Sequence, residues 1–488
     1  MMKKSILMLS LLCSGLSYAE YHIEFINNTN RALKAQSSFN AGASSQAIST
    51  SAYKGYDKDI SPYGYAPLFD INYNKGIKNS QTYCFVSTLT DLSHQKAFNR
   101  IDFNLCVRGD WIGSSVMSSD SEVYTDDGHS KITLFDHKPT PGSFPYNTQL
   151  ISKKEIFTHD GQAFNLYIGI VHHGASVQST DDIFFVLDAP QQSLASQVNE
   201  EANVLNVLTY NVQLNPFYFA VGNTRMNMAS ERATIIPTKI QHYDVVVAEE
   251  LFDKSHREHF IAGMSKSYPY HYGPVYPSEV DPILTSGVVI FSRWPIVQSD
   301  ALIYSDCTGS DCGAHKTIQW VKINKKGKLY NIFGTHTQAW NDEKAIAARD
   351  QQFQQIYSFI QSRNIPNTEP VLLMGDLNIN WWEKDKVQYN RNIMPHVLQA
   401  AHWINQTLVP YSSDFTKNKM NTDDSREMLD YVLAIKDYKQ PIIQTTQILV
   451  LRAPDENAMY DGGLKVPYAP YGMLDLSDHF ALESQLVY

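Results

Sequence analysis

The segment VLLMGDLNIN (residues 371–380) decides the fold of the second half of this 488-residue chain. Its apolar beginning predicts a buried strand, and Gly375 with Asp376 marks the place where that strand ends. Asp376 and Asn378 are two positions apart on an extended segment, so their side chains point the same way. The segment therefore joins a core strand to a pair of polar side chains that can address one ligand.

Four other segments also place an acid, an amide or a histidine at a strand end. They are LTYNV (208–212), VVVAEELFD (245–253), FGTHTQA (333–339) and LSDHF (476–480). Hard oxygen ligands beside two histidines suit Mg²⁺-assisted attack of water on a phosphoester. Each segment alone is weak evidence, because an ordinary turn beside a strand has the same composition. Together and in this order, they predict an enzyme that cuts phosphodiester or phosphomonoester bonds.

The oxygen-bearing side chains of these segments are candidates for a metal and phosphate site. Glu250 is the best carboxylate for holding Mg²⁺, Asn211 can add a neutral oxygen, and Asp478 is free to face the same ion. Oxygen ligation favours Mg²⁺, although Mn²⁺ or Co²⁺ could substitute. Asp376 can orient water or metal, and the amide of Asn378 can donate to a phosphoryl oxygen.

The histidines are candidates for proton transfer and charge stabilisation. His479 is the expected general base, because an imidazole titrates near working pH, and Asp430 is the expected orienting carboxylate on its other nitrogen. His336 would donate a hydrogen bond to the developing negative charge. The alternatives are structural: Glu249 and Glu250 as a solvated strand end, Asp430 as a cap, and either histidine as a packing residue.

Length and composition predict two folded domains behind a targeting sequence. We expect a signal peptide at 1–19, a β-rich domain of unknown role at 20–188, a polar linker at 189–202 and a catalytic domain at 203–488. The first domain reads as an antiparallel β-sandwich, with short strands separated by Gly, Asn, Ser and Asp turns. The second alternates strands with helical patterns and predicts an α/β fold of two packed mixed sheets with helices outside.

Three expected helices and nine expected strands define that second domain. The helices are residues 226–241, 256–265 and 342–363. The strands are residues 204–212, 243–251, 287–296, 316–323, 329–338, 370–379, 428–435, 447–451 and 478–487.

The N-terminus and the cysteines both indicate a secreted protein. Residues 1–19 combine two lysines, a short apolar run and a Ser-Tyr-Ala end that a signal peptidase can cleave. Beyond them, no stretch approaches the roughly 18 apolar residues of a membrane span. An even number of remaining cysteines favours disulfides in an exported chain, and we expect the pairs Cys307–Cys312 and Cys84–Cys106. The alternative is free buried thiols.

The charge balance argues against a nucleic-acid partner. Residues 1–201 carry 15 Lys and Arg against 20 Asp and Glu, and residues 202–488 carry 25 against 30, so each part has a net charge of −5. Nucleic-acid binding usually requires a basic excess. A local basic groove could still overturn this inference.

The second half of the chain resembles the endonuclease/exonuclease/phosphatase superfamily, which has the fold of DNase I. Within that superfamily it most resembles the bacterial neutral sphingomyelinases. The more specific signs are AEELFD, YPY, SGVVIFSRWPI, the Cys307/Cys312 loop running into HKTIQWVKI, and GTHTQAW, within residues 203–488. The resemblance implies a four-layer α/β sandwich, Mg²⁺ dependence and hydrolysis of sphingomyelin to ceramide and phosphocholine. It also implies that Glu250 is the principal metal ligand with Asn211 beside it.

Carried across by motif, the catalytic set comprises His336, Asp376, Asn378, Asp430 and His479. The expected partner is membrane sphingomyelin or a related phospholipid. We expect a monomer in peripheral contact with the bilayer, with haemolysis and virulence as consequences. The long N-terminal domain departs from the compact family members. Residues 454–475 contain tyrosines in place of the family's aromatic-tipped hairpin, so bilayer contact is expected from that stretch or from the N-terminal domain.

Two other functions remain open on the sequence. One is a secreted nuclease of the same fold, which would need a basic groove. The other is a lipid-binding or cell-binding toxin module whose hydrolase half is degenerate.

Overall fold

The structure is a computed structural model. It describes residues 20–40, 47–72, 78, 80–94, 96, 98–108, 116–117, 122–124, 131–133, 151–157, 163–172, 181–189, 191–216, 229–276, 285–382, 386–398, 410–418, 420–421, 425–453 and 475–488. The expected signal peptide and the tyrosine-containing stretch 454–474 lie outside these residues, so both stay predictions.

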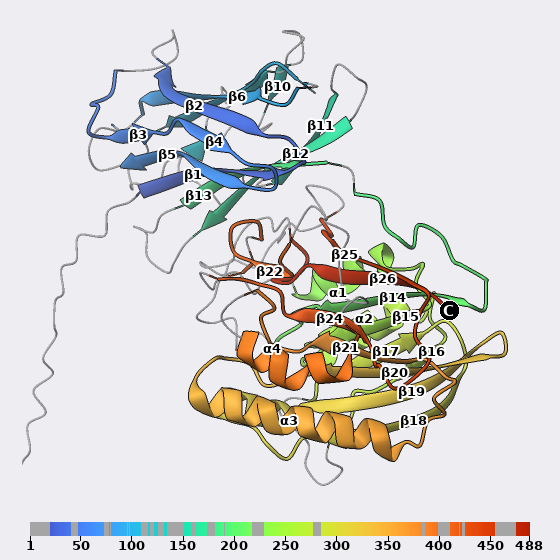
Figure 1. Ribbon diagram of the computed structural model, residues 1–488. Coiled ribbons are helices and arrows are strands. Elements are labelled where there is room, and N and C mark those ends of the chain that lie inside the picture. Colours follow the sequence, from blue (N-terminus) through green and yellow to red (C-terminus); the bar gives the residue numbers. More distant parts are fainter. Residues whose placement is uncertain are drawn as a thin grey trace, which may run out of the picture.

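Two β-sheets form the N-terminal region (Figure 1). In its described part, the first sheet has the order β11-β12-β13-β1-β5-β3 and the second β10-β9-β7-β6-β2-β4, with β8 paired to β7. The strands of the first sheet are β1 (Glu20–Asn28), β3 (Tyr53–Gly55), β5 (Tyr65–Asn72), β11 (Ile151–Phe157), β12 (Ala163–His172) and β13 (Asp181–Asp188). Those of the second are β2 (Leu33–Asn40), β4 (Lys58–Ile60), β6 (Thr82–Asp91), β7 (Ile101–Arg108), β8 (Val116–Met117), β9 (Glu122–Tyr124) and β10 (Lys131–Thr133).

Aromatic side chains fill the space between these two sheets, which confirms the β-sandwich prediction. Phe69 and Phe85 lie 5.3 Å apart between ring centroids, and Phe103 and Phe185 lie 4.4 Å apart. The sandwich is not purely antiparallel, because β1 and β13 pair in parallel. These two strands come from opposite ends of the region, so no tight turn forces them to run in opposite directions.

Both predicted disulfides are present. Cys84 and Cys106 are directly opposite each other on β6 and β7, and their sulfurs are bonded. Cys307 and Cys312 close a loop with a sequence separation of 5 residues.

The second half of the chain forms two further sheets. Their described strands follow the orders β16-β17-β15-β14-β26-β25 and β18-β19-β20-β21-β24. The first sheet contains β14 (Val204–Asn211), β15 (Val245–Glu249), β16 (Tyr270–Tyr272), β17 (Val289–Ser292), β25 (Ile443–Leu449) and β26 (Ala481–Val487). The second contains β18 (Ile296–Ile303), β19 (Thr317–Lys325), β20 (Lys328–His336), β21 (Val371–Asp376) and β24 (Asp430–Ala434).

Helices cover the outer faces of these two sheets (Figure 1). They are α1 (Ala229–Lys239), α2 (Lys254–Met264), α3 (Glu343–Ser362) and α4 (Lys386–Asn392), together with the 3-10 turns Gly309–Ala314 and Met394–His396. A small two-stranded ribbon, β22 (Ser413–Asp414) and β23 (Arg426–Glu427), completes the described elements.

Three apolar cores hold four layers together. Val207, Val247 and Met374 are among the buried residues between the two sheets. A second core packs α1 and α2 on the β14–β15 sheet, and a third packs α3 and α4 on the β20–β21 sheet. The order helices, sheet, sheet, helices is the four-layer α/β sandwich that the resemblance implied.

Two details differ from the expectation drawn from sequence. Residues 287–296 were expected as one strand, but β17 and β18 belong to different sheets and the chain crosses between layers at Arg293–Pro295. The proline after Trp294 removes a ladder donor and favours this break. Helix α4 was not expected, since its seven residues carry too short a pattern.

The expected linker lies against the second half of the chain. Ser193 donates a hydrogen bond to Glu483 at 2.7 Å, and the amide of Val450 donates to the side-chain oxygen of Gln191 at 2.9 Å. The boundary at 189–202 remains our proposal. These contacts run along β25 and β26, so the segment is anchored to the sheet beside it.

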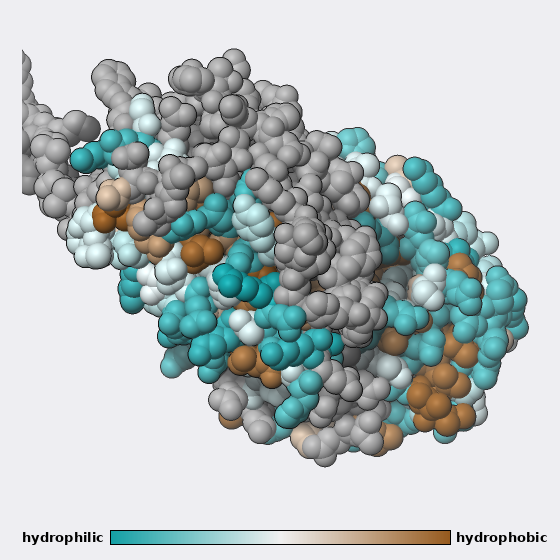
Figure 2. Space-filling model, turned by 90° about the horizontal axis from the view of Figure 1, so that it is seen from above, coloured by the Kyte–Doolittle hydropathy of each residue, from teal (hydrophilic) through white to brown (hydrophobic). Residues whose placement is uncertain are grey.

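The described surface is mixed in character. On the face drawn in Figure 2, small groups of hydrophobic residues are separated by hydrophilic ones. Exposed large hydrophobic side chains include Trp340, Trp382 and Ile442. None of the helices in the described ranges has the length and apolar character needed to cross a bilayer.

Candidate active site

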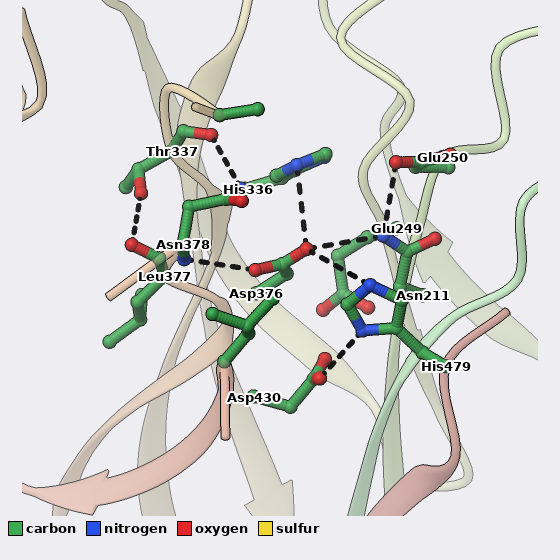
Figure 3. A network of polar contacts seen from close by, with 12 residues as sticks. Asn211, Glu249, Glu250, His336, Thr337, Asp376, Leu377, Asn378, Asp430 and His479 are labelled. Carbon is green, nitrogen blue, oxygen red and sulfur yellow. Dashed lines mark hydrogen bonds and ion pairs between the residues drawn. The ribbon is translucent and has the colours of Figure 1, made fainter. Parts of the chain in front are cut away.

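The predicted polar side chains meet where the two sheets of the second half of the chain present the same ends of their strands. Asn211 ends β14, His336 ends β20 and Asp376 ends β21. The register places His336 opposite Asp376, and Asp376 opposite Asp430 of β24. Figure 3 shows these side chains pointing toward one another from different strands.

Asp376 lies at the centre of this group (Figure 3). Its Oδ1 accepts a hydrogen bond from the backbone N–H of Asn378 at 2.9 Å, and its Oδ2 accepts one from the amide of Asn211 at 3.2 Å. The Nε2 atoms of His336 and His479 lie 3.6 and 3.9 Å from the same Oδ2. Asp376 therefore connects the two histidines with the amide of Asn211.

Glu250 and Asp478 form a second side of the site. Asn211 donates from its amide nitrogen to Glu250 at 3.0 Å, and Gln213 donates to Asp478 at 2.6 Å. Glu250, Asp478 and Asn378 are partly exposed, whereas Asn211 is buried behind them. The site is thus open to solvent on the side of these two carboxylates.

His479 is held by Asp430, as the sequence predicted. Its Nδ1 lies 2.8 Å from Asp430 Oδ2, and both side chains are buried. Burial by itself lowers the pKa of His479, but the charges of Asp430, Asp376 and Asp478 outweigh it and raise that pKa well above its ordinary value. Asp430 therefore fixes the ring orientation and leaves Nε2 facing the site.

His336 has a partner that the sequence did not reveal. Lys316, at 5% exposure, places its Nζ 3.0 Å from His336 Nε2, 2.6 Å from the carbonyl oxygen of Thr337 and 2.8 Å from Asp311. Burial, and then the charge of Lys316, lower the pKa of His336 to about 3. His336 is therefore neutral, and because an ammonium can only donate, its Nε2 accepts and its Nδ1 carries the proton.

The proton on His336 Nδ1 lies in the protein interior. This buried atom has no hydrogen-bond partner among the described residues. Buried donors are normally satisfied, so an orphaned one at a site indicates a place for an acceptor.

The pKa values of the carboxylates in and beside the site are raised. Burial, and then the charge of Asp478, raise the pKa of Glu250 to about 7. Burial also raises the pKa of Asp478, and it raises the pKa of Glu249 well above its ordinary value. Glu249 was weighed as a solvated strand end, but its side chain is fully buried and accepts a hydrogen bond from Thr209 at 2.6 Å.

These residues fit a divalent cation with hard-oxygen preference. Within the described ranges, no group of three or more His, Cys, Asp or Glu residues is arranged to hold a metal. The expected set is of another kind, namely the carboxylates of Glu250 and Asp478 with the amide of Asn211. Burial, and after it the charge of neighbouring carboxylates, raise the pKa values of Glu250 and Asp478, and the side-chain oxygen of Gln213 beside Asp478 is buried without a partner among the described residues. A bound cation would favour the ionised carboxylates and would give the oxygen of Gln213 a partner.

Backbone geometry fixes the strand ends. Gln213, Glu250 and Asn378 each adopt φ between +47° and +60°, a region that costs a residue with a side chain about 1 kcal/mol or more. Arg232, fully buried, donates to the carbonyl oxygens of Val212 and Gln213 at 2.7 and 2.9 Å. Arg232 therefore stabilises the turn at Gln213, beside the site, in spite of its unfavourable φ.

Sequence reasoning missed Lys316, Gln213 and Arg232. Lys316 stands in the quoted stretch HKTIQWVKI, directly after the Cys307/Cys312 loop, so its position beside a motif was visible. Its contact with His336 was not, because 20 residues and a strand reversal separate them. Gln213 lies two residues after Asn211 and could have been found by extending that motif.

Comparisons with known proteins agree with this geometry. The endonuclease/exonuclease/phosphatase family description matches residues 208–479. Sphingomyelinase C of Bacillus cereus is 28% identical over 352 residues, covering 66% of this chain and 96% of that protein. A phospholipase C of Staphylococcus aureus is 31% identical over 265 residues, covering 50% of this chain and 76% of that protein.

A further relative and a solved structure extend the likeness. Sphingomyelinase C 2 of Leptospira interrogans is 28% identical over 323 residues, 61% of this chain, and the match spans about half (49%) of that protein. The crystal structure of SmcL superposes with a TM-score of 0.51 at 26% identity, covering 59% of this chain and all of that chain.

Proposed function

The chain belongs to the endonuclease/exonuclease/phosphatase family, and from that premise we propose that it is a metal-dependent sphingomyelinase C. The family and the sphingomyelinase and phospholipase C relatives support a hydrolase acting on phosphodiester bonds. The proposed reaction converts sphingomyelin to ceramide and phosphocholine. The observation that carries it is the convergence of His479–Asp430, Asp376 and Asn211–Glu250 within one set of contacts.

His479 is the proposed general base. Its Nδ1–H is engaged by Asp430 at 2.8 Å, so Nε2 is the atom that takes the proton from water. Asp376 lies 3.9 Å from that nitrogen and can hold the same water by accepting its other proton. The water oxygen then forms a bond to phosphorus while the bond from phosphorus to the ceramide oxygen breaks. The released ceramide oxygen takes a proton from solvent water, and His479 returns its proton to solvent.

His336 and Asn378 are the proposed stabilisers of the phosphoryl charge. His336 offers the Nδ1–H that has no partner in the described part of the chain, and Lys316 holds the ring in this tautomer. The side chain of Asn378 is partly exposed and already directed by a hydrogen bond to the carbonyl oxygen of Thr337 at 3.1 Å. Fixed donors of this type stabilise charge as it develops.

Glu250, Asp478 and Asn211 are the proposed ligands of a divalent cation, with Glu250 as the principal one. When bound, Mg²⁺ would neutralise phosphoryl oxygens and the leaving oxygen, and Mn²⁺ or Co²⁺ could substitute. The two carboxylates support this assignment, because burial and neighbouring carboxylates raise their pKa values and a bound cation would favour their ionised forms.

We also propose secretion and peripheral contact with a bilayer. The two disulfides support an oxidising compartment. A lipid substrate requires the enzyme to meet a membrane surface. The acidic balance of residues 202–488 supports a lipid substrate over DNA.

Release of phosphocholine from sphingomyelin liposomes, with Mg²⁺ and with EDTA, tests the proposal. Supercoiled DNA is incubated under the same conditions, and the His479→Ala variant is the control. Metal-dependent phosphocholine release with intact DNA is the expected result. Nicked DNA with intact lipid would make the protein a nuclease, and membrane lysis without phosphocholine release would favour a binding module.

A further inference from the structure

Residues 475–480, which we call the base segment, carry Asp478 and His479 and are held by contacts along their whole length. The carbonyl oxygen of Leu476 accepts from Arg232 at 3.2 Å, and that of Ser477 accepts from the side chain of Asn418 at 2.8 Å. The amide of Phe480 donates to the carbonyl oxygen of Ser412 at 2.7 Å. The position of His479 therefore depends on residues outside the proposed catalytic and metal-binding set.

Arg452 contacts both ends of the base segment. Its Nη1 pairs with the carboxylate of Asp475, and the backbones of these two residues also form a bridge. At the other end, its guanidinium carbon lies 5.8 Å from the ring centroid of Phe480. Arg452 and Asp475 are 6% and 2% exposed, so water competes little for this ion pair.

The same guanidinium is bound to the N-terminal region. Its Nε donates to Asp188 Oδ2 at 3.1 Å, and Asp188 is the last residue of β13. The other oxygen of Asp188 accepts from the side chain of Asn28, at the end of β1, at 2.7 Å. Asp188 is thus fixed within the N-terminal sheet while it holds one edge of Arg452.

A second contact between the two regions reaches the base segment in the same way. The ring of Tyr63 lies 5.3 Å from Lys417 Nζ, and Lys417 precedes the Asn418 that holds Ser477. Figure 1 shows the N-terminal sheets next to the part of the second domain that carries β22 and β25, where these contacts occur. Arg452 contacts the base segment directly, and Lys417 is the chain neighbour of Asn418, which contacts it.

We propose that the N-terminal domain positions the catalytic base. Asp188 fixes the guanidinium of Arg452, and Arg452 fixes Asp475 and Phe480 on either side of Asp478–His479. Asp188 and Arg452 are positioning residues, since neither touches the reacting atoms. The inference rests on the proposed function where it concerns catalysis, and on the contacts alone where it concerns the order of the base segment.

The test uses Asp188→Asn in the full chain. Asparagine keeps the size of the side chain and an oxygen for Asn28, but removes one of the two carboxylate charges paired with Arg452. Hydrolysis of soluble p-nitrophenylphosphorylcholine separates catalysis from membrane contact. We expect kcat to fall about tenfold with KM within about twofold of wild type, because misplacement of a base by a fraction of an ångström affects the chemical step.

Three further variants make the effect specific. Arg452→Gln should lower kcat at least as much, Arg452→Lys should recover part of it, and the double variant Asp188→Asn/Arg452→Gln should be no worse than Arg452→Gln alone. Asp102→Asn, which removes a carboxylate paired with Arg100 in the N-terminal domain, should leave kcat unchanged.

Amide hydrogen exchange gives a readout that needs no substrate. The peptide spanning residues 475–480 should exchange faster in Asp188→Asn and Arg452→Gln than in wild type, and at the wild-type rate in Asp102→Asn. Faster exchange in a chain that hydrolyses nothing would support the positioning contact while the proposed function failed. A lower melting temperature with wild-type kcat and wild-type exchange would overturn the inference, since the contact would then serve stability alone.

Discussion

The imidazole of His479 and the carboxylate of Asp430 share one hydrogen bond, with Nδ1 2.8 Å from Oδ2. Asp430 is fully buried, and its other oxygen has no hydrogen-bond partner in the described part of the chain. Its charge acts on His479 with little screening, and with Asp376 and Asp478 it raises the pKa of the imidazole well above the ordinary value in spite of burial. One side chain therefore controls both the orientation and the basicity of the expected base.

Replacing Asp430 should change the pH dependence as well as the rate. In Asp430→Asn the charge that raises the pKa of His479 is lost, so the acidic limb of the kcat/KM profile should move to lower pH. We expect kcat to fall by about 10² or more, because the amide no longer selects the Nδ1–H tautomer. The measurement is the pH–rate profile at saturating Mg²⁺.

The control for that measurement is Asp437→Asn, a change of an exposed carboxylate just beyond β24. It should reproduce the wild-type profile. A wild-type acidic limb in Asp430→Asn would contradict the pairing of Asp430 with the base.

Lys316 should matter through His336. In Lys316→Met the ring loses the donor on Nε2, and Asp311 loses its partner. We expect kcat to fall about 10- to 100-fold because His336 is no longer held in one tautomer and orientation. The pKa of His336, followed by NMR of the ring protons, should rise because the positive charge of Lys316 is gone.

Lys322→Met, on the strand that directly follows Lys316, provides a comparison. Lys322 pairs with Glu369 at 3.0 Å, away from His336. Its loss should leave kcat within about twofold of wild type, as expected for a peripheral ion pair. Equal losses in the two variants would mean that any lysine replacement in or next to β19 lowers kcat and that Lys316 has no special role.

Local sequence was enough to predict the parts of the site that each lie within one segment. Asp376 and Asn378 were predicted as a pair on one extended segment. The pair is at the site, but the extended backbone was wrong, because β21 ends at Asp376 and Asn378 adopts φ +48°. The pairing of Asp430 with His479 crosses 49 residues, yet it was predicted because a base needs an acidic partner and LDYV offered one at a strand. The structure brings all of these residues together, and their catalytic and metal-binding roles remain proposals.

The features that were missed depend on contacts between distant segments. Arg452 binds Asp188 across 264 residues, and nothing in the sequence around either residue indicates the other. The crossing from β17 to β18 follows from the way two sheets stack, which hydrophobic patterning does not encode. The parallel pairing of β1 with β13 likewise needs the assembled sheet.

Gly375 should be irreplaceable, because β20 and β21 approach closely beside it. A Cβ at this position would lie 1.8 Å from the carbonyl oxygen of Thr335, and the residue has φ +139°. Gly375→Ala should cost on the order of 3–5 kcal/mol of unfolding free energy and displace the neighbouring Asp376. Urea unfolding and kcat of the folded fraction measure the two effects.

Gly327→Ala separates the steric cost from the backbone cost. Gly327 also has a positive φ, +91°, but a Cβ there meets no atom within 4 Å. Its replacement should cost only about 1–2 kcal/mol and leave kcat unchanged. Similar costs for the two alanines would show that the contact with Thr335 relaxes easily.

Metal binding should stabilise the fold more strongly as the pH rises. In EDTA the folded pKa of Glu250, about 7, lies above the unfolded value of about 4.3. Between these values the folded state keeps a proton that the unfolded state has released, so stability falls as the pH rises. Mg²⁺ competes with that proton, so its effect on the melting temperature should be small near pH 5.5 and largest near pH 8.

The size of this shift and its origin can both be measured by thermal unfolding. At a concentration of about 100 times Kd, Mg²⁺ adds about 2.7 kcal/mol, which corresponds to roughly 5–10 °C. Glu250→Gln should remove most of the Mg²⁺ shift and also the share of the EDTA stability loss with rising pH that Glu250 contributes, whereas Glu258→Gln, an exposed change on α2, should alter neither. An undiminished Mg²⁺ shift in Glu250→Gln would place the ion elsewhere, because a neutral amide cannot replace the charge that the cation is expected to balance.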